Sequence, residues 1–178
     1  MIIYLPFADF ELSAQALDTR RLGNQRKDAF ELLEALLSNK ESSFETTLVD
    51  MWRGYESALA NYNIALSKEI DRRGYVDDYY YETFLLMNKY ALSFLEAKRP
   101  HWLGNESIHS SHRSALKREV TQTLAKTHYA LKNQATMNFG LSEDELKERV
   151  LLAEAEFNWY DEKNWSDSTL IPLAWPKK

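Results

Sequence analysis

Apolar residues recur at helical spacing along most of the chain. Within residues 47–73 they stand at positions 48, 51, 52, 55, 59, 62, 66 and 70, which places them on one face of a helix. Similar patterns predict helices over residues 10–17, 19–37, 78–97 and 142–158, and a helix from residue 105 to about 117, with its continuation toward residue 132 left open. No segment shows the two-residue alternation of a half-buried strand. We therefore predict an all-α protein, a compact bundle of roughly five to six helices with a short extended N-terminus.

Capping and breaking residues set the expected ends of these helices. Asp18 or Thr19 is suited to the N-cap of the helix over residues 19–37. Gly74 is a good C-terminal stop for the helix that precedes it. Ser142 and Glu145 have the spacing of a capping box, which predicts a helix start at this point.

Length and composition are those of a folded domain. With 178 residues, 44% of them hydrophobic, the chain is most simply one domain over residues 1–178. It has no cysteine, which excludes disulfides and Cys-zinc sites. No apolar run approaches the ~20 residues of a membrane span, and the N-terminus lacks a signal pattern. We expect a cytoplasmic protein that does not associate with membranes.

The charge is unevenly distributed along an acidic chain. The net charge is −5, and residues 141–167 hold nine acidic against three basic side chains. Four cations nevertheless stand within residues 20–27, at the start of a predicted helix: Arg20, Arg21, Arg26 and Lys27. A local patch of this kind bears on the choice of partner more than the total charge does.

A helical wheel separates these cations. Arg26 falls on the apolar face, where an unpaired guanidinium would cost several kcal/mol or more. It must therefore meet a carboxylate as a structural ion pair or contact an anionic ligand. Arg21, Gln25 and Asp28 form a row along one edge of that face, whereas Arg20 faces the other way.

The predicted helix that begins at Asn105 shows a second polar cluster. His112 points between apolar residues, His109 lies on the flank and Arg113 just beyond it. A buried histidine is commonly a satisfied core residue, but two histidines beside an arginine also fit a binding site. Their three-residue spacing lacks the glutamate of a zinc-protease helix, so we predict neither a metal site nor a cofactor.

Several motifs together resemble a known family. LDTRRLGNQR and WLGNESIHSSHR are long and specific, and MIIYLPFADF, MWRGYESAL, RRGYVDD and LIPLAWP stand in the same familiar order. The sequence resembles the pyrimidine-dimer DNA glycosylases of the phage endonuclease V type, in particular their bacterial and phage branch. The matching blocks are spread over about half the chain. Residues 117–153 depart from the branch and are expected to be a helical insertion or extension.

The resemblance implies a compact all-α enzyme whose N-terminal amine attacks the deoxyribose C1′ of a damaged nucleotide. The base leaves, an imine forms, and β-elimination can then cut the strand. By this resemblance the nucleophile is the amine of Met1 and the catalytic carboxylate is Asp28, at a position where the family has Glu. The residues expected to bind DNA are Arg20, Arg21, Gln25, Arg26, His109, His112 and Arg113.

We therefore expect a DNA glycosylase, with or without AP-lyase activity, that removes a damaged or modified pyrimidine from duplex DNA. Two alternatives remain open. One is a catalytically inactive nucleic-acid or nucleotide-binding protein, which the Asp in place of Glu favours. The other is a helical protein-interaction module whose acidic C-terminal half docks a protein partner.

Overall fold

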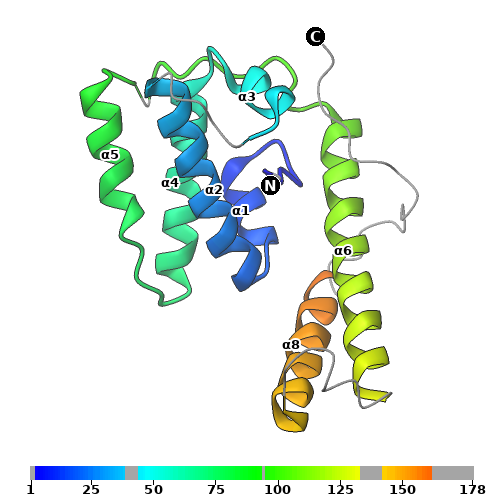
Figure 1. Cartoon of the computed structure of the whole chain (residues 1–178). Helices are drawn as coiled ribbons and strands as arrows, with labels where there is room; N and C mark the ends of the chain where they lie inside the picture. The colour runs from blue at the N-terminus through cyan, green and yellow to red at the C-terminus, as the bar shows by residue number, and fades with distance from the viewer. Residues whose placement is uncertain (1–2, 39–43, 94, 133–141, 162–178) are drawn as a thin grey trace. The chain divides into compact units, whose positions relative to one another are not determined.

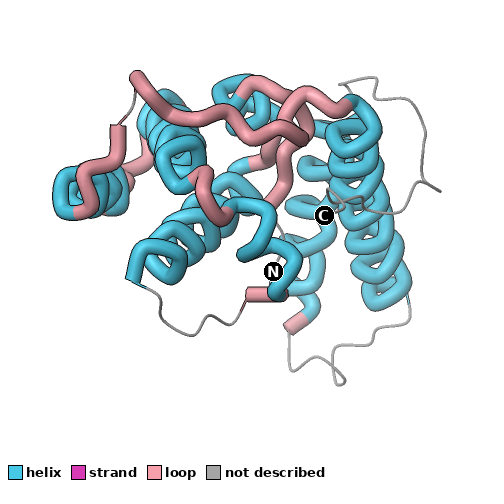
Figure 2. The backbone as a smooth tube through the Cα atoms, turned by 90° about the horizontal axis from the view of Figure 1, so that it is seen from above, coloured by secondary structure: helices cyan, strands magenta, loops and turns pink. Residues whose placement is uncertain are grey.

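The computed structural model describes residues 3–38, 44–93, 95–132 and 142–161 (Figures 1 and 2). The described residues form helices and no strands, which confirms the predicted all-α class. The helices are α1 (Phe10–Ala16), α2 (Thr19–Ser38), α3 (Thr46–Trp52), α4 (Glu56–Arg72), α5 (Tyr79–Lys89), α6 (Glu106–Lys132) and α8 (Glu143–Asp161).

The chain divides into two compact units, and the division falls within α6, between His109 and Ser110. The first unit contains α1 to α5 and the start of α6, and the second contains the rest of α6 and α8. The predicted start of an insertion at residue 117 falls inside the continuous helix α6. That the chain is one domain stays a prediction.

Helix α4 is the centre of the first unit, where it packs against α1, α2 and α5 (Figure 1). Its apolar stripe is continuous because Leu59, Tyr62 and Leu66 are spaced by three or four residues, and all three are fully buried. Leu22 and Leu33 of α2 pack into the same core. Each such side chain stabilises the fold by about 1.5–3 kcal/mol relative to an exposed one.

The prediction of one helix over residues 47–73 is wrong, because the chain turns between α3 and α4. Gly54 has a φ of 81°, a left-handed conformation that glycine adopts without steric cost. Its N–H donates to Glu56 Oε1 (2.8 Å), which supports the start of α4. The apolar spacing continues in phase across this turn, and this is why periodicity alone did not show it.

The predicted helix over residues 78–97 is also too long, since α5 ends at Lys89. The N–H of Tyr90 still bonds to Leu86 O (3.0 Å), and Ala91 then takes a φ of 51°. A left-handed residue just beyond the last turn is a common way for a helix to end. The predicted caps fared better: Asp18 Oδ1 accepts from the N–H of Arg21 (2.9 Å) at the start of α2.

The second unit contains a pair of helices joined by a polar contact. His128 Nε2 of α6 lies 3.0 Å from Glu154 Oε1 of α8. The capping box at the start of α8 is confirmed, because Ser142 Oγ accepts from the N–H of Glu145 and Glu145 Oε2 accepts from the N–H of Ser142 (3.2 and 2.6 Å). In the described part of the chain, no helix combines the length and apolarity that a membrane crossing requires.

Candidate functional site

The N-terminal segment is held against α2 and α4 by hydrogen bonds to its backbone. The N–H of Tyr4 donates to Gln25 Oε1 (2.8 Å), and Tyr62 Oη donates to Tyr4 O (2.7 Å). One residue further on, Leu5 O lies 2.8 Å from His109 Nδ1. All of these groups are buried, so the segment that leads back to the N-terminus has a fixed course.

Gln25 still has an unused donor at this place. Its Oε1 accepts from Tyr4, which fixes the orientation of the carboxamide, and its side chain is buried. Among the described residues, no acceptor lies within hydrogen-bonding distance of Gln25 Nε2. Leaving such a buried group unpaired costs about 1–3 kcal/mol. A fold that keeps this donor has it available for an acceptor on a ligand.

Asp28 lies almost one helical turn after Gln25 on α2 and is half-buried. Burial raises the pKa of its carboxyl group above the ordinary value, and the negative charge of Glu31 raises the pKa further, against the opposing positive charges of the N-terminus and Lys27. The described residues supply it with neither a hydrogen bond nor an ion pair. A carboxyl group with a raised pKa and no hydrogen bond or ion pair among the described residues is suited to proton transfer and to stabilising a transient cation.

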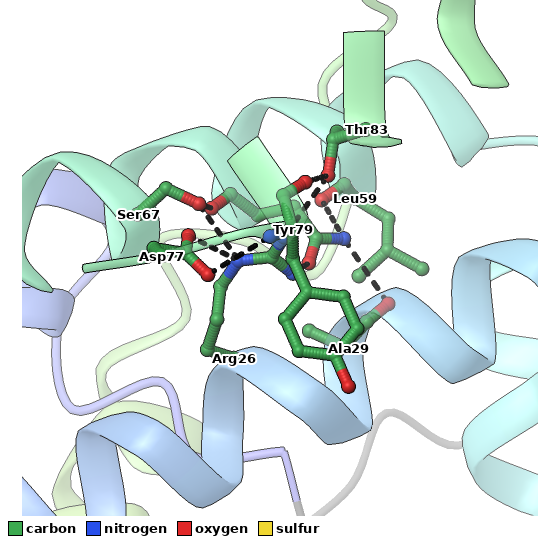
Figure 3. A network of polar contacts seen from close by, with 8 residues as sticks. Arg26, Ala29, Leu59, Ser67, Asp77, Tyr79 and Thr83 are labelled. Carbon is green, nitrogen blue, oxygen red and sulfur yellow. Dashed lines mark hydrogen bonds and ion pairs between the residues drawn. The ribbon is translucent and has the colours of Figure 1, made fainter. Parts of the chain in front are cut away.

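Arg26 is directed into the protein, between α4 and α5 (Figure 3). Its Nε donates to Ser67 Oγ (2.7 Å) and forms an ion pair with Asp77 Oδ2 (3.1 Å). Its Nη1 donates to Asn63 Oδ1 (2.7 Å) and its Nη2 to Thr83 Oγ1 (3.2 Å). Only 1% of its side chain is exposed. The guanidinium therefore joins three structural elements.

Aromatic rings complete the surroundings of Arg26. Its guanidinium carbon lies 4.9 Å from the centroid of the Tyr79 ring and 5.6 Å from that of Phe30, within the range of cation–π attraction. Burial lowers the pKa of Arg26, and the negative charge of Asp77 opposes this shift. A pocket of about 330 Å³ reaches Arg26, but Asp77 and Asp78 line it and would repel a phosphate. The geometry matches the structural ion pair, one of the two interpretations of the sequence.

The other predicted cations of α2 differ in exposure. Arg21 is buried and its Nη1 forms an ion pair with Asp18 Oδ2 (2.8 Å). Arg20 is exposed, so its side chain is accessible from solvent. The row of Arg21, Gln25 and Asp28 predicted from the helical wheel is present as one edge of α2, with the N-terminal segment bonded to its middle member.

The predicted histidines are both buried. His109 has both ring nitrogens engaged: Nε2 accepts from the N–H of Gly104 (3.0 Å), so Nδ1 carries the proton that it donates to Leu5 O. This neutral histidine links the start of α6 to the N-terminal segment. His112 is buried and Arg113 half-buried, and both belong to the second unit. Met1, the predicted nucleophile, lies outside the described residues.

No group of three or more potential metal ligands comes together in the described ranges of the chain. Sequence reasoning missed the partners of Arg26. One signal was available: Asn63 and Ser67 stand four residues apart on the otherwise apolar face of α4, as a polar pair opposite a buried cation would. No local signal pointed to Asp77, which is 51 residues from Arg26.

Comparison with known proteins finds a family match in the N-terminal part of the chain. Residues 1–83 match the family model described as pyrimidine dimer DNA glycosylase. The resemblance predicted from the sequence motifs is thereby confirmed over these residues, which contain Gln25 and Asp28, and it supports a DNA glycosylase at the level of the family. Searches of the curated proteins and of the solved structures found no match.

Proposed function

Since residues 1–83 belong with the pyrimidine dimer DNA glycosylases, we propose that this protein removes a damaged or modified pyrimidine from duplex DNA by means of its N-terminal amine. One observation carries the proposal: the N–H of Tyr4 is bonded to Gln25, less than one turn of α2 before Asp28. Three residues of chain span at most about 10 Å. This short connection to Tyr4 supports our assignment of the Met1 amine and the Asp28 carboxylate to one site.

The chemistry follows from these two groups. An α-amine has an unperturbed pKa of about 7.7–8.0, so a useful fraction is neutral and nucleophilic near pH 7. Its nitrogen bonds to C1′ of the damaged nucleotide while the glycosidic bond breaks and its electron pair leaves with the base. Loss of the amine proton and opening of the sugar ring then give the imine.

Asp28 stabilises the positive charge that develops at C1′ and exchanges protons with the sugar oxygen and the departing base. Burial raises the pKa of Asp28, a shift toward the range in which proton transfer is efficient. Removal of a proton from C2′ of the imine would expel the 3′ phosphate, which is the AP-lyase step. Arg20 and the amide of Gln25, whose Nε2 has no acceptor among the described residues, are the groups of α2 that we assign to the DNA.

A base-release assay with a matched set of variants tests the proposal. The substrates are duplexes that carry a thymine dimer or an abasic site, which report base removal and strand cleavage separately. We expect Asp28→Asn to lower the rate by about 100-fold or more, as is usual for loss of a general acid–base group. Glu34→Gln, further along the same helix, serves as the control and should keep most of the activity.

Asp28→Glu tests the role of the shorter side chain. It restores the family residue and moves the carboxylate by about 1.5 Å, a distance that can change rates by two orders of magnitude. An increase in turnover would place the catalytic carboxylate at this position. DNA binding by the wild-type protein without base release or cleavage would instead favour the catalytically inactive binding protein.

A further inference from the structure

The segment between α5 and α6 carries positive charge that no described carboxylate neutralises. Lys98, Arg99 and His101 are all exposed, and among the described residues neither Lys98 nor Arg99 forms an ion pair. Several other exposed cations of the first unit do pair with a carboxylate: Lys27 with Glu31, Lys68 with Glu11 and Arg72 with Glu69. Unneutralised cations are notable in a protein with a net charge of −5.

Tyr55 orders two of these side chains. Its hydroxyl group lies 3.1 Å from His101 Nδ1, and the Nζ of Lys98 lies 5.3 Å from the centroid of its ring. The cation–π contact restrains a lysine that would otherwise be free to move. When the Tyr55 hydroxyl group donates a hydrogen bond to Nδ1, the Nε2–H of His101 remains available as a donor to a ligand.

The backbone that carries these side chains is fixed on both sides. Trp102, which is 3% exposed, donates from Nε1 to Met51 O (3.2 Å). The N–H of Gly104 donates to His109 Nε2, and the other nitrogen of the same ring donates to Leu5 O. Through these two hydrogen bonds, His109 connects the cationic segment to the N-terminal segment of the chain.

Neighbouring carboxylates are occupied by partners of their own. A pocket of about 450 Å³ adjoins Arg99, and Asp9 and Glu11 line it. Asp9 Oδ1 accepts from the N–H of Leu12 (2.8 Å), whereas Glu11 faces Lys68. Glu96 is the remaining acidic residue close in sequence to Lys98. The donors of Lys98 and Arg99 are thus not taken up by a described carboxylate and suit an anionic partner.

We propose that Lys98, Arg99 and His101 form a contact surface for the phosphate backbone of duplex DNA. The choice of DNA as the ligand rests on the proposed function, but the surface lies beyond the family match, which ends at residue 83. Its exposed donors suit phosphate oxygens, which fix the register of a duplex without reading its sequence. Because His109 links the cationic segment to the N-terminal segment, a DNA phosphate bound here positions the DNA backbone relative to the N-terminal amine.

The test compares two double variants of equal charge. Lys98→Gln with Arg99→Gln removes the proposed contacts, whereas Lys27→Gln with Lys68→Gln removes two cations that pair with carboxylates. Affinity for an undamaged duplex of about 20 base pairs is measured by fluorescence anisotropy over a range of salt concentrations. Circular dichroism confirms that each variant is folded, as expected for exposed positions.

Losing two phosphate contacts should reduce the steepness of the plot of log K against log salt concentration by about 1.8. If the affinities converge near 1 M salt, this corresponds to about 60-fold weaker binding at about 0.1 M for the first pair. The control pair should keep the wild-type slope. An unchanged slope in the first pair, an equal loss in the control, or a wild-type affinity that does not depend on salt would each overturn the proposal.

The outcome is separable from that of the proposed function. A lower slope in the first pair together with no base release by the wild-type protein would support the surface and contradict the glycosylase. Base release by the wild-type protein, together with an unchanged salt slope in the first pair, would support the glycosylase and contradict the proposed DNA-contact surface.

Discussion

Replacing Arg26 with methionine separates the structural role of this residue from a role in binding DNA. Methionine keeps an unbranched apolar stem but removes the donors that reach Ser67, Asn63, Thr83 and Asp77. The Asp77 side chain is 7% exposed and would remain buried without its cation. Breaking a buried ion pair by removing one partner costs about 3–5 kcal/mol.

This loss is a large part of the stability of a domain, which is typically about 5–15 kcal/mol. For a chain of this size each kcal/mol lowers Tm by about 2–4 °C, so Arg26→Met should lower Tm by about 6–20 °C. Urea unfolding followed by circular dichroism measures the change, with Lys27→Met as the control. Lys27 is exposed, and its pairing with Glu31 (3.7 Å) contributes only about 0.3–0.5 kcal/mol.

The reasoning also predicts strong coupling between Arg26 and Asp77. In a double-mutant cycle with Asp77→Asn, the two changes should be non-additive by about 1–3 kcal/mol. The result that would refute the structural role is an Arg26→Met variant with wild-type stability and weakened DNA binding. Such a variant would mean that the guanidinium leaves its network to meet a phosphate.

Three further predictions concern single side chains. Because the pKa of Asp28 is raised in the folded protein, ionisation of this group opposes folding, and wild-type stability falls as pH rises through the raised pKa. Asp28→Asn should therefore be more stable than the wild-type protein at pH 7 and lose this advantage below about pH 4. Chemical unfolding at both pH values measures the difference. Glu69 behaves in the opposite way: burial alone would raise its pKa, but hydrogen bonds from Arg72 and Arg73 outweigh it and lower the pKa. Its contribution is thus present above about pH 4.3 and lost as pH falls through the lowered pKa, and Glu69→Gln should cost about 1–2 kcal/mol at pH 7 and progressively less below about pH 4. Gly54→Ala places a side chain at a φ of 81° and should lower the stability by about 1–2 kcal/mol in thermal unfolding. Gly23→Ala within α2 should raise the stability, because an added Cβ meets nothing within 4 Å there.

Local sequence determined much of what could be predicted. The apolar repeat and the capping residues gave the helices and most of their starts, because both signals act over a few residues. The helical wheel also placed Gln25 and Asp28 on one edge of α2. The break at Gly54 was missed since the apolar positions on either side of it stay in phase.

Contacts between distant segments could not be predicted in this way. The bond from Tyr62 to Tyr4 joins residues 58 positions apart, and that from His109 to Leu5 joins residues 104 positions apart. Whether Arg26 meets a carboxylate or a ligand depends on where Asp77 lies, which only the packing of α2, α4 and α5 decides. The wheel showed that a partner was required but could not say which one.

Covalent trapping tests the central claim most directly. The protein is incubated with abasic duplex DNA and borohydride, which reduces an imine to a stable amine, and the adduct is digested and mapped by mass spectrometry. The account predicts a DNA adduct on the N-terminal peptide, at the Met1 amine, and its loss when that amine is acetylated. An adduct on a lysine elsewhere in the chain, or no adduct with a protein that still binds the duplex, would contradict it.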